Sequence, residues 1–367
     1  MDNRSSVQCV TRPSSPTTVE KQEIDQLDIG EIYFVQEVDR VDGTRSPYVK
    51  IGMVKDASRH NSEERLTDHQ TGNPRNLSLY HVTKTPGPFR VERFLHQQFG
   101  PNRVKSEWFK LDDSELDAAV RIAEDMAREA FVHIPIIEEA ERLGTTPSDD
   151  TKLAATAEST EWLQRLSVAK AAVKVCNELS AAYRAVATTL PEELKAAAEE
   201  EELFLTEYYT TKRFDSKAFA AAHPDLAAKF TEVWTEVRGR FTAKTTDVDL
   251  NEREHDLIAF RSQFTELCTK VHNGEADFGE AFEMRQVLEQ YAGAYGWEHQ
   301  VADANLRAIC GTASGIDNQA TWNRVLKDKS GLDEDGLESQ HPNEYAAFVK
   351  VTTQTRTKTR RRARKKV

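Results

Sequence analysis

The chain has 367 residues, a formal net charge of −12, and 49 basic against 61 acidic side chains. Its four cysteines lie far apart without a CxxC pair, which argues against a zinc site or a disulfide framework and favours a reducing compartment. No apolar run approaches the length of a membrane span, so we expect a cytoplasmic protein of two or three domains with no membrane partner.

The charge is distributed unevenly along the chain. The block 31–111 has a net charge of +3, the last eighteen residues have nine basic and no acidic side chains, and the stretch 112–349 carries −22. Two basic ends on an acidic body suit a polyanion that is bound at the ends and repelled by the body. The alternative is that the acidic residues form an ordinary solvated helical surface.

The N-terminal third begins with a polar segment rich in Ser, Thr and Pro at 1–28, which we interpret as a mobile leader. Two apolar runs at 32–35 and 48–54 flank the turn signal Asp42-Gly43 and predict an antiparallel hairpin. The pattern then predicts a polar helix, a half-buried strand and a second helix, at 61–70, 77–82 and 89–99.

Five short motifs follow one another in this block: Gly30-Glu31-Ile32-Tyr33, Lys50-Ile51-Gly52, the helix that carries Arg65, Val91–His96, and Glu107-Trp108-Phe109. Their order resembles the GIY-YIG nuclease superfamily, and more narrowly a phage-associated branch whose second motif is Lys-Ile-Gly. The resemblance covers residues 30–111. It implies an α+β protein in which a small antiparallel-sheet domain at 29–111 is a metal-dependent DNA endonuclease using Mg²⁺ (or Mn²⁺).

The resemblance also assigns roles to residues on the first two strands. Tyr33 would activate or position the attacking water; its alternative is a buried aromatic of an apolar strand. Lys50 stands where the superfamily has its second tyrosine, and lysine can neutralise a phosphate or lower the pKa of a water molecule. Tyr48 lies two residues earlier, on the same strand face, and is a candidate replacement for that hydroxyl.

The remaining candidates come from the two helices and the closing strand. Arg65 matches the arginine that holds the scissile phosphate, and His69, one helical turn later, is a candidate proton carrier. Glu92 matches the single metal-binding glutamate, since one carboxylate with waters and a phosphate suffices for Mg²⁺. Arg103 is expected to contact a phosphate. Solvated or salt-bridged surface side chains are the alternative for each of them.

Beyond the first block, long Ala/Glu-rich stretches predict helices. We expect a helix and linker at 112–150, with Pro135 breaking the helix and the linker at 145–150. A helical bundle or coiled coil at 151–295 would leave an apolar stripe to bury, which predicts a homo-oligomer, and a small helical module follows at 296–350.

A weak internal echo joins two segments at a spacing of 118 residues, Phe214–Val233 and Leu332–Val351. Its clearest elements are His223-Pro224 and His341-Pro342, in which Pro marks the start of a helix. One interpretation is a coincidence of two similar helix starts. The other is a duplicated small helical module that docks on a partner or on nucleic acid.

The last segment, 351–367, is predicted to be a disordered basic tail that binds DNA through phosphates. Its alternatives are a solubility tail or an arm that docks on the acidic body of the protein itself. The basic residues at its end are Arg360, Arg361, Arg362, Arg364, Lys365 and Lys366.

Three functions follow from these features. The first is a DNA endonuclease tethered to a helical body. The second is a DNA-binding protein that uses the same fold without cleaving, because Lys50 replaces a catalytic hydroxyl. The third is a helical oligomerisation or partner-docking scaffold that the N-terminal domain delivers to DNA.

Overall fold

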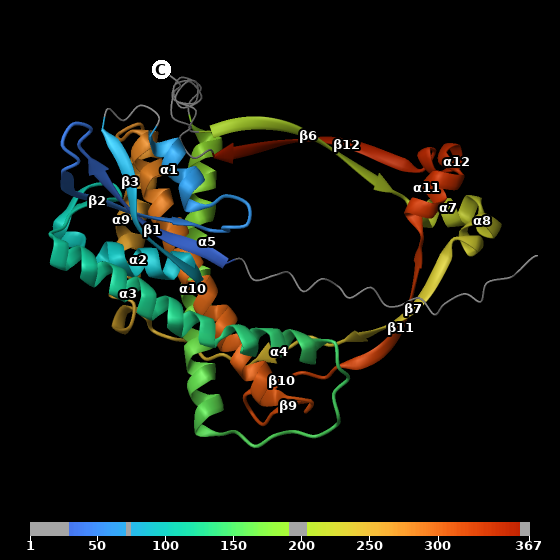
Figure 1. Cartoon of the computed structure of the whole chain (residues 1–367). Helices are drawn as coiled ribbons and strands as arrows, with labels where there is room; N and C mark the ends of the chain where they lie inside the picture. Colours follow the sequence, from blue (N-terminus) through green and yellow to red (C-terminus); the bar gives the residue numbers. More distant parts are fainter. Residues whose placement is uncertain (1–28, 71–74, 191–203, 360–367) are drawn as a thin grey trace, which may run out of the picture.

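The computed structural model describes residues 29–70, 75–190 and 204–359. A sheet of five antiparallel strands is followed by a mainly helical body, which confirms the α+β prediction. Two long two-stranded ribbons extend from the body to a small group of helices (Figure 1). The expected leader at 1–28 lies outside the described residues. Among the helices that are described, none combines the length and apolar character needed to cross a membrane.

The N-terminal sheet has the strand order β3-β1-β2-β5-β4. The β1–β2 hairpin forms where the sequence predicts it. Its turn contains Gly43 with a φ of 73°, a left-handed conformation that glycine adopts without steric cost. The strands are β1 (Ile29–Val38), β2 (Arg45–Val54), β3 (Asn76–Pro86), β4 (Arg103–Lys105) and β5 (Trp108–Lys110).

Helices cover both faces of this sheet, because successive side chains of a strand point to opposite sides. One face packs on α2 and α3 through a core that includes Phe34 and Ile51. The other face carries Tyr33, which lies in a smaller apolar cluster with Leu66 of α1. The covering helices are α1 (Ser62–Gln70), α2 (Pro88–Gln98) and α3 (Asp113–Val132).

The helical body is built around α5 and α10, two helices of 33 residues that pack along one another. With α9 they share a core that includes Leu179, Phe264 and Leu288. The apolar stripe that motivated the predicted homo-oligomer is thus buried within one chain, and the oligomer and the coiled coil stay predictions. Pro135 lies in the first turn of α4, where the sequence predicts a break after α3. The helices are α4 (Ile134–Gly144), α5 (Ala157–Thr189), α9 (His255–His272) and α10 (Phe278–Cys310).

The body packs directly against the N-terminal domain through α10 and α2. A Cβ atom at Gly293 would lie 2.3 Å from the ring of Phe89, so the close approach of the two helices requires glycine there. The guanidinium of Arg93 lies over the rings of Tyr291 and Tyr295, at 4.3 and 5.1 Å from their centroids. The two parts of the molecule are therefore joined by close packing as well as by the chain itself.

The segment 145–150 is not the free linker that the sequence predicts. The backbone N–H of Ser148 donates to the carbonyl of Arg324, and that of Asp149 donates to the carbonyl of Thr312, both at 2.9 Å. Thr312 and Arg324 lie on either side of the short strands β9 (Gly315–Ile316) and β10 (Ala320–Thr321), and β10 also pairs with β8 (Thr242–Ala243).

Long strands occur where the sequence predicts helices or disorder. β6 (Phe204–Phe214) pairs with β12 (Val349–Thr359), and β7 (Thr231–Arg238) pairs with β11 (Val325–Leu332). Strands therefore interrupt the helical bundle predicted for 151–295 and the helical module predicted for 296–350, and the disorder predicted for 351–359 is wrong. The paired strands lie far apart in sequence, so no local turn signal marks them. The remainder of the tail, 360–367, lies outside the described residues.

The sequence echo corresponds to a structural duplication. Each copy is a strand, two short helices and a second strand, and the copies contact each other reciprocally. The backbone N–H of Asp215 donates to the carbonyl of Phe348 at 3.0 Å, and that of Asp333 donates to the carbonyl of Phe230 at 2.8 Å. The echo is therefore not a coincidence of two similar helix starts. The short helices are α7 (Ser216–Ala222), α8 (Pro224–Lys229), α11 (Glu334–Gln340) and α12 (Pro342–Ala346).

Candidate functional site

Tyr33 lies in the middle of β1 with 2% of its surface exposed. Its hydroxyl is 3.1 Å from Nε2 of His69, which belongs to the last turn of α1. The interpretation of Tyr33 as a buried aromatic of an apolar strand therefore holds, and its role toward an attacking water stays a prediction. Its ring is part of the apolar core, and its hydroxyl is hydrogen-bonded to an imidazole, the side chain that most often carries protons in enzymes.

Gly52 makes the space that the Tyr33 side chain occupies. The two residues are directly opposite each other in the β1–β2 pairing. A Cβ atom at position 52 would lie 2.5 Å from both Cζ and Oη of Tyr33. The Lys-Ile-Gly motif therefore needs glycine at its third position, because a larger side chain would collide with Tyr33 of the neighbouring strand.

Lys50 is buried on the same face of β2, and its Nζ contacts the carboxylate of Glu107. Burial alone would raise the pKa of Glu107, but the charge and hydrogen bond of Lys50 outweigh it and the pKa is lowered. Lys50, predicted to neutralise a phosphate, is here neutralised by Glu107.

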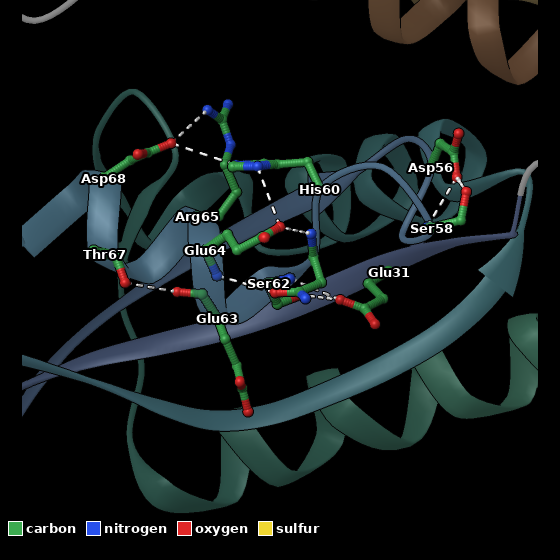
Figure 2. A network of polar contacts seen from close by, with 11 residues as sticks. Glu31, Asp56, Ser58, His60, Ser62, Glu63, Glu64, Arg65, Thr67 and Asp68 are labelled. Atoms are coloured by element: carbon green, nitrogen blue, oxygen red, sulfur yellow. Dashed lines mark hydrogen bonds and ion pairs between the residues drawn. The ribbon is translucent and has the colours of Figure 1, made fainter.

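The N-terminus of α1 is fixed to β1 by a buried carboxylate. Glu31 accepts hydrogen bonds from the backbone N–H and the hydroxyl of Ser62, at 2.8 and 2.6 Å. Figure 2 shows this anchor and, further along the helix, Arg65 and Asp68 reaching toward one another. Arg65 is 3.7 Å from Asp68, and its side chain is partly exposed. This contact fixes the start of α1 against the sheet. Arg65 and His69 both belong to α1, which covers Tyr33.

Glu92 lies on α2 with 3% of its surface exposed. Its carboxylate accepts a hydrogen bond of 3.0 Å from the side-chain amide of Gln290, which belongs to α10 of the helical body. The predicted metal ligand thus lies against the interface between the two parts of the molecule, and a residue of the body holds it.

His96, one turn after Glu92, is buried and neutral. Its Nε2 donates to the carbonyl of Ile51 at 2.9 Å, which leaves Nδ1 as the acceptor facing Gln290 at 3.4 Å. Burial lowers the pKa of His96 to about 4. Arg103 donates to the carbonyl of His96 at 3.2 Å, and its guanidinium lies over the ring of Phe109.

The structure brings Tyr33 within hydrogen-bond distance of His69 and Lys50 into contact with Glu107, and Glu107 lies close enough to His69 for a protonated His69 to lower its pKa. Glu92 is in a neighbouring cluster, with His96 and Gln290. Tyr48 lies near the start of β2 and is 39% exposed. The predicted tail residues, Arg360, Arg361, Arg362, Arg364, Lys365 and Lys366, lie outside the described residues.

Sequence reasoning did not assign a catalytic or metal-binding role to His96, Glu107 or Gln290. The first two belong to motifs that carry the family resemblance, so their position in those motifs was an available signal. Gln290 is 198 residues from Glu92 in an Ala-rich helix, and no feature of the sequence connects them.

A metal ion bound in this domain would have to be held by a single carboxylate with waters and a phosphate. Among the described residues, no group of three or more His, Cys, Asp or Glu side chains is arranged to hold a metal ion. Mg²⁺ does not need such a group, because it commonly keeps several waters and binds through one or two carboxylates and substrate phosphates. Glu92 is the carboxylate that the resemblance indicates, and it lies in the neighbouring cluster with His96 and Gln290.

Residues 30–124 match the model of the T5orf172 domain, a phage-associated, nuclease-like domain, and this segment contains all of the five-stranded sheet except its first residue. Neither a curated protein nor a solved structure matches the chain. The match is compatible with a DNA-binding or nuclease-like role for about a quarter of the chain. The narrower GIY-YIG assignment stays a prediction.

Proposed function

We propose that the N-terminal domain is a metal-dependent DNA endonuclease. The observation that supports this most is the buried Tyr33 hydroxyl bonded to His69, beside the Lys50–Glu107 pair and under the helix that carries Arg65. A buried phenol next to an imidazole on a nuclease-like domain is suited to accept a proton from water and pass it on.

In this proposal Tyr33 orients the attacking water at a phosphodiester. As the water attacks the phosphorus, its proton goes to the Tyr33 oxygen and the Tyr33 proton goes to Nε2 of His69. The P–O bond to the leaving sugar oxygen breaks, and that oxygen takes a proton from solvent. Arg65 turns from Asp68 to the scissile phosphate, where its planar fork matches two phosphate oxygens. Glu92 would hold Mg²⁺ or Mn²⁺, which stabilises the charge that develops on the phosphate.

A second candidate function is DNA binding without cleavage. It is favoured by the burial of Glu92 against Gln290 and by the pairing of Lys50 with Glu107, because both charged groups are already occupied. A third, a helical scaffold delivered to DNA by the N-terminal domain, is supported by the length of the body and its close packing on α2.

Conversion of supercoiled plasmid to the nicked form tests the first function. We expect nicking with Mg²⁺ or Mn²⁺ and none with a chelator. Arg65→Ala and Glu92→Ala should each slow nicking by a factor of several hundred, since loss of one such stabilising group costs about 3–4 kcal/mol of barrier. Arg128→Ala is the matched control, because Arg128 also pairs with an aspartate three residues away on an exposed helix surface. A protein that retards DNA in a gel but never nicks it would support the second function instead.

A further inference from the structure

The two ribbons of the duplicated module are alike in backbone but different in charge. The β6/β12 ribbon has five basic residues and one acidic residue in its sequence. The β7/β11 ribbon, which the duplication relates to it, has three of each. Comparing the two ribbons therefore shows which charges a ribbon of this fold needs in order to form.

The neutral ribbon balances its charges within itself. Glu236 contacts Arg238 and lies 3.7 Å from Lys329. The hydroxyl of Thr235 donates to Asp328 at 2.8 Å across the strand pair. A ribbon of this kind thus forms with no excess charge, and the positive charge of β6/β12 needs a cause other than folding.

On the basic ribbon, Lys212 and Arg213 are exposed. In the strand register Lys212 is opposite Val351 and Arg213 is opposite Lys350, so the two cations occupy opposite faces. Lys350 also forms a 2.6 Å ion pair with Asp215 at the end of the ribbon. The neighbouring exposed positions are threonines on both strands: Thr210, Thr211, Thr352 and Thr353.

These side chains are suited to a polyanionic duplex. Lysine, arginine and threonine are among the residues that most often contact DNA phosphates. A two-stranded ribbon fits the major groove of B-form DNA, whereas the major groove of A-form RNA is too deep and narrow for side chains to reach into. We infer that the β6/β12 ribbon is a second DNA-binding element, which contacts duplex DNA through Lys212 and Arg213.

This element is separate from the candidate nuclease site. Figure 1 shows the ribbons leading away from the five-stranded sheet, toward the group formed by α7, α8, α11 and α12. Binding at the ribbon therefore does not depend on cleavage at Tyr33. The ribbon has an excess of basic residues, whereas the stretch 112–349 as a whole carries −22, so the ribbon would attract DNA more than the acidic body does.

The test is the affinity of the full-length protein for a DNA duplex of mixed sequence, measured by fluorescence anisotropy with chelator present. Lys212→Ala/Arg213→Ala should weaken binding roughly tenfold and lower the slope of log affinity against log salt by about 2, if each lost phosphate contact counts about 0.9. Arg238→Ala/Lys327→Ala removes the same two charges from the neutral ribbon and should change affinity less than twofold. Thermal unfolding of both variants checks that the fold is retained.

Two outcomes would overturn this inference. An equal loss of affinity in both double variants would mean that only total charge matters, and no loss in Lys212→Ala/Arg213→Ala would mean that the ribbon does not contact DNA. An RNA duplex of the same sequence provides the second readout. We expect it to bind the wild-type protein more weakly and to be insensitive to Lys212→Ala/Arg213→Ala; an equal sensitivity would overturn the assignment to B-form DNA.

Discussion

At the scale of single residues, the candidate site depends on the space around one phenol ring. Tyr33 crosses the face of β2 at the position of Gly52, and its hydroxyl ends within hydrogen-bond distance of His69. A site of this kind requires that the ring be fixed by packing, since catalytic geometry tolerates only small displacements. Gly52 and Tyr33 therefore form one structural unit, although 18 residues and a turn separate them in the chain.

Gly52→Ala should lower the free energy of unfolding by about 1–3 kcal/mol, because the new methyl group forces the Tyr33 ring out of its place. The rate of nicking by Gly52→Ala should also fall, because the Tyr33 hydroxyl is displaced. Gly100→Ala is the control, since a Cβ at Gly100 meets no atom within 4 Å, and we expect a change of less than about 0.5 kcal/mol. Urea unfolding measures both. Equal stability of the two variants would contradict the packing that we describe at Tyr33.

His96 makes stability depend on pH. Its pKa is lowered to about 4 in the folded protein from an ordinary 6.5. Between these two pH values the unfolded chain binds a proton that the folded protein does not, so stability falls as the pH falls from about 6.5 to about 4. The contribution is up to about 3 kcal/mol, at 1.36 kcal/mol for each unit of pKa. In urea unfolding across this pH range, the free energy of unfolding should depend less steeply on pH for His96→Asn than for the wild type. Identical slopes would contradict the role given to His96.

At the scale of elements, the contact between α10 and α2 determines the surroundings of Glu92. Gly293 lets the helices approach, and Gln290 then reaches the carboxylate of Glu92 and the free ring nitrogen of His96. The amide of Gln290 satisfies two acceptors in a place that water does not easily reach. The body is thereby part of the environment of the predicted metal ligand.

Gln290→Ala should destabilise the protein by about 1–3 kcal/mol, because a buried carboxylate loses its hydrogen-bond donor. It should also change the Mg²⁺ concentration needed for half-maximal nicking, which a purely structural role would leave unchanged. Gln300→Ala, at an exposed position on the same helix, is the control. An unchanged Mg²⁺ dependence would mean that α10 supports the fold and not the site.

Elements with local signals could be predicted from the sequence, and elements defined by distant partners could not. The β1–β2 hairpin follows from Asp42-Gly43, and the break before α4 follows from Pro135. The ribbons escaped prediction because their strands pair across large sequence distances and lie among Ala/Glu-rich stretches. The echo at His223-Pro224 and His341-Pro342 indicated the duplication, but only the structure reveals that the two copies pair with each other.

The same division applies to the candidate site. Tyr33, Lys50 and His69, named from motif positions, do lie in one cluster with Glu107. The partners of Lys50 and Glu92 were not predictable, because ion pairs and buried amide contacts depend on how separate elements pack. Motif positions identify residues, and packing determines which of their charges are already neutralised.

At the scale of the whole molecule, the chain combines a nuclease-like domain, a helical body packed on it, and a duplicated module at the end of two ribbons (Figure 1). The acidic body separates two regions with basic character, the N-terminal domain and the β6/β12 ribbon. This arrangement suits one DNA duplex held at two places, with the body between them repelling it. We expect the N-terminal domain to be the place where the DNA is cleaved.

The most direct test of that claim measures nicking rate and DNA affinity side by side in Tyr33→Phe, which removes only the hydroxyl and keeps the packing of the ring. We predict that nicking falls by a factor of several hundred while the dissociation constant for DNA stays within about twofold. Tyr80→Phe is the matched control, since Tyr80 is an exposed tyrosine of the same sheet whose hydroxyl donates to Asp117 at 2.8 Å, and it should retain full activity. Nicking by Tyr33→Phe at the wild-type rate would contradict the account.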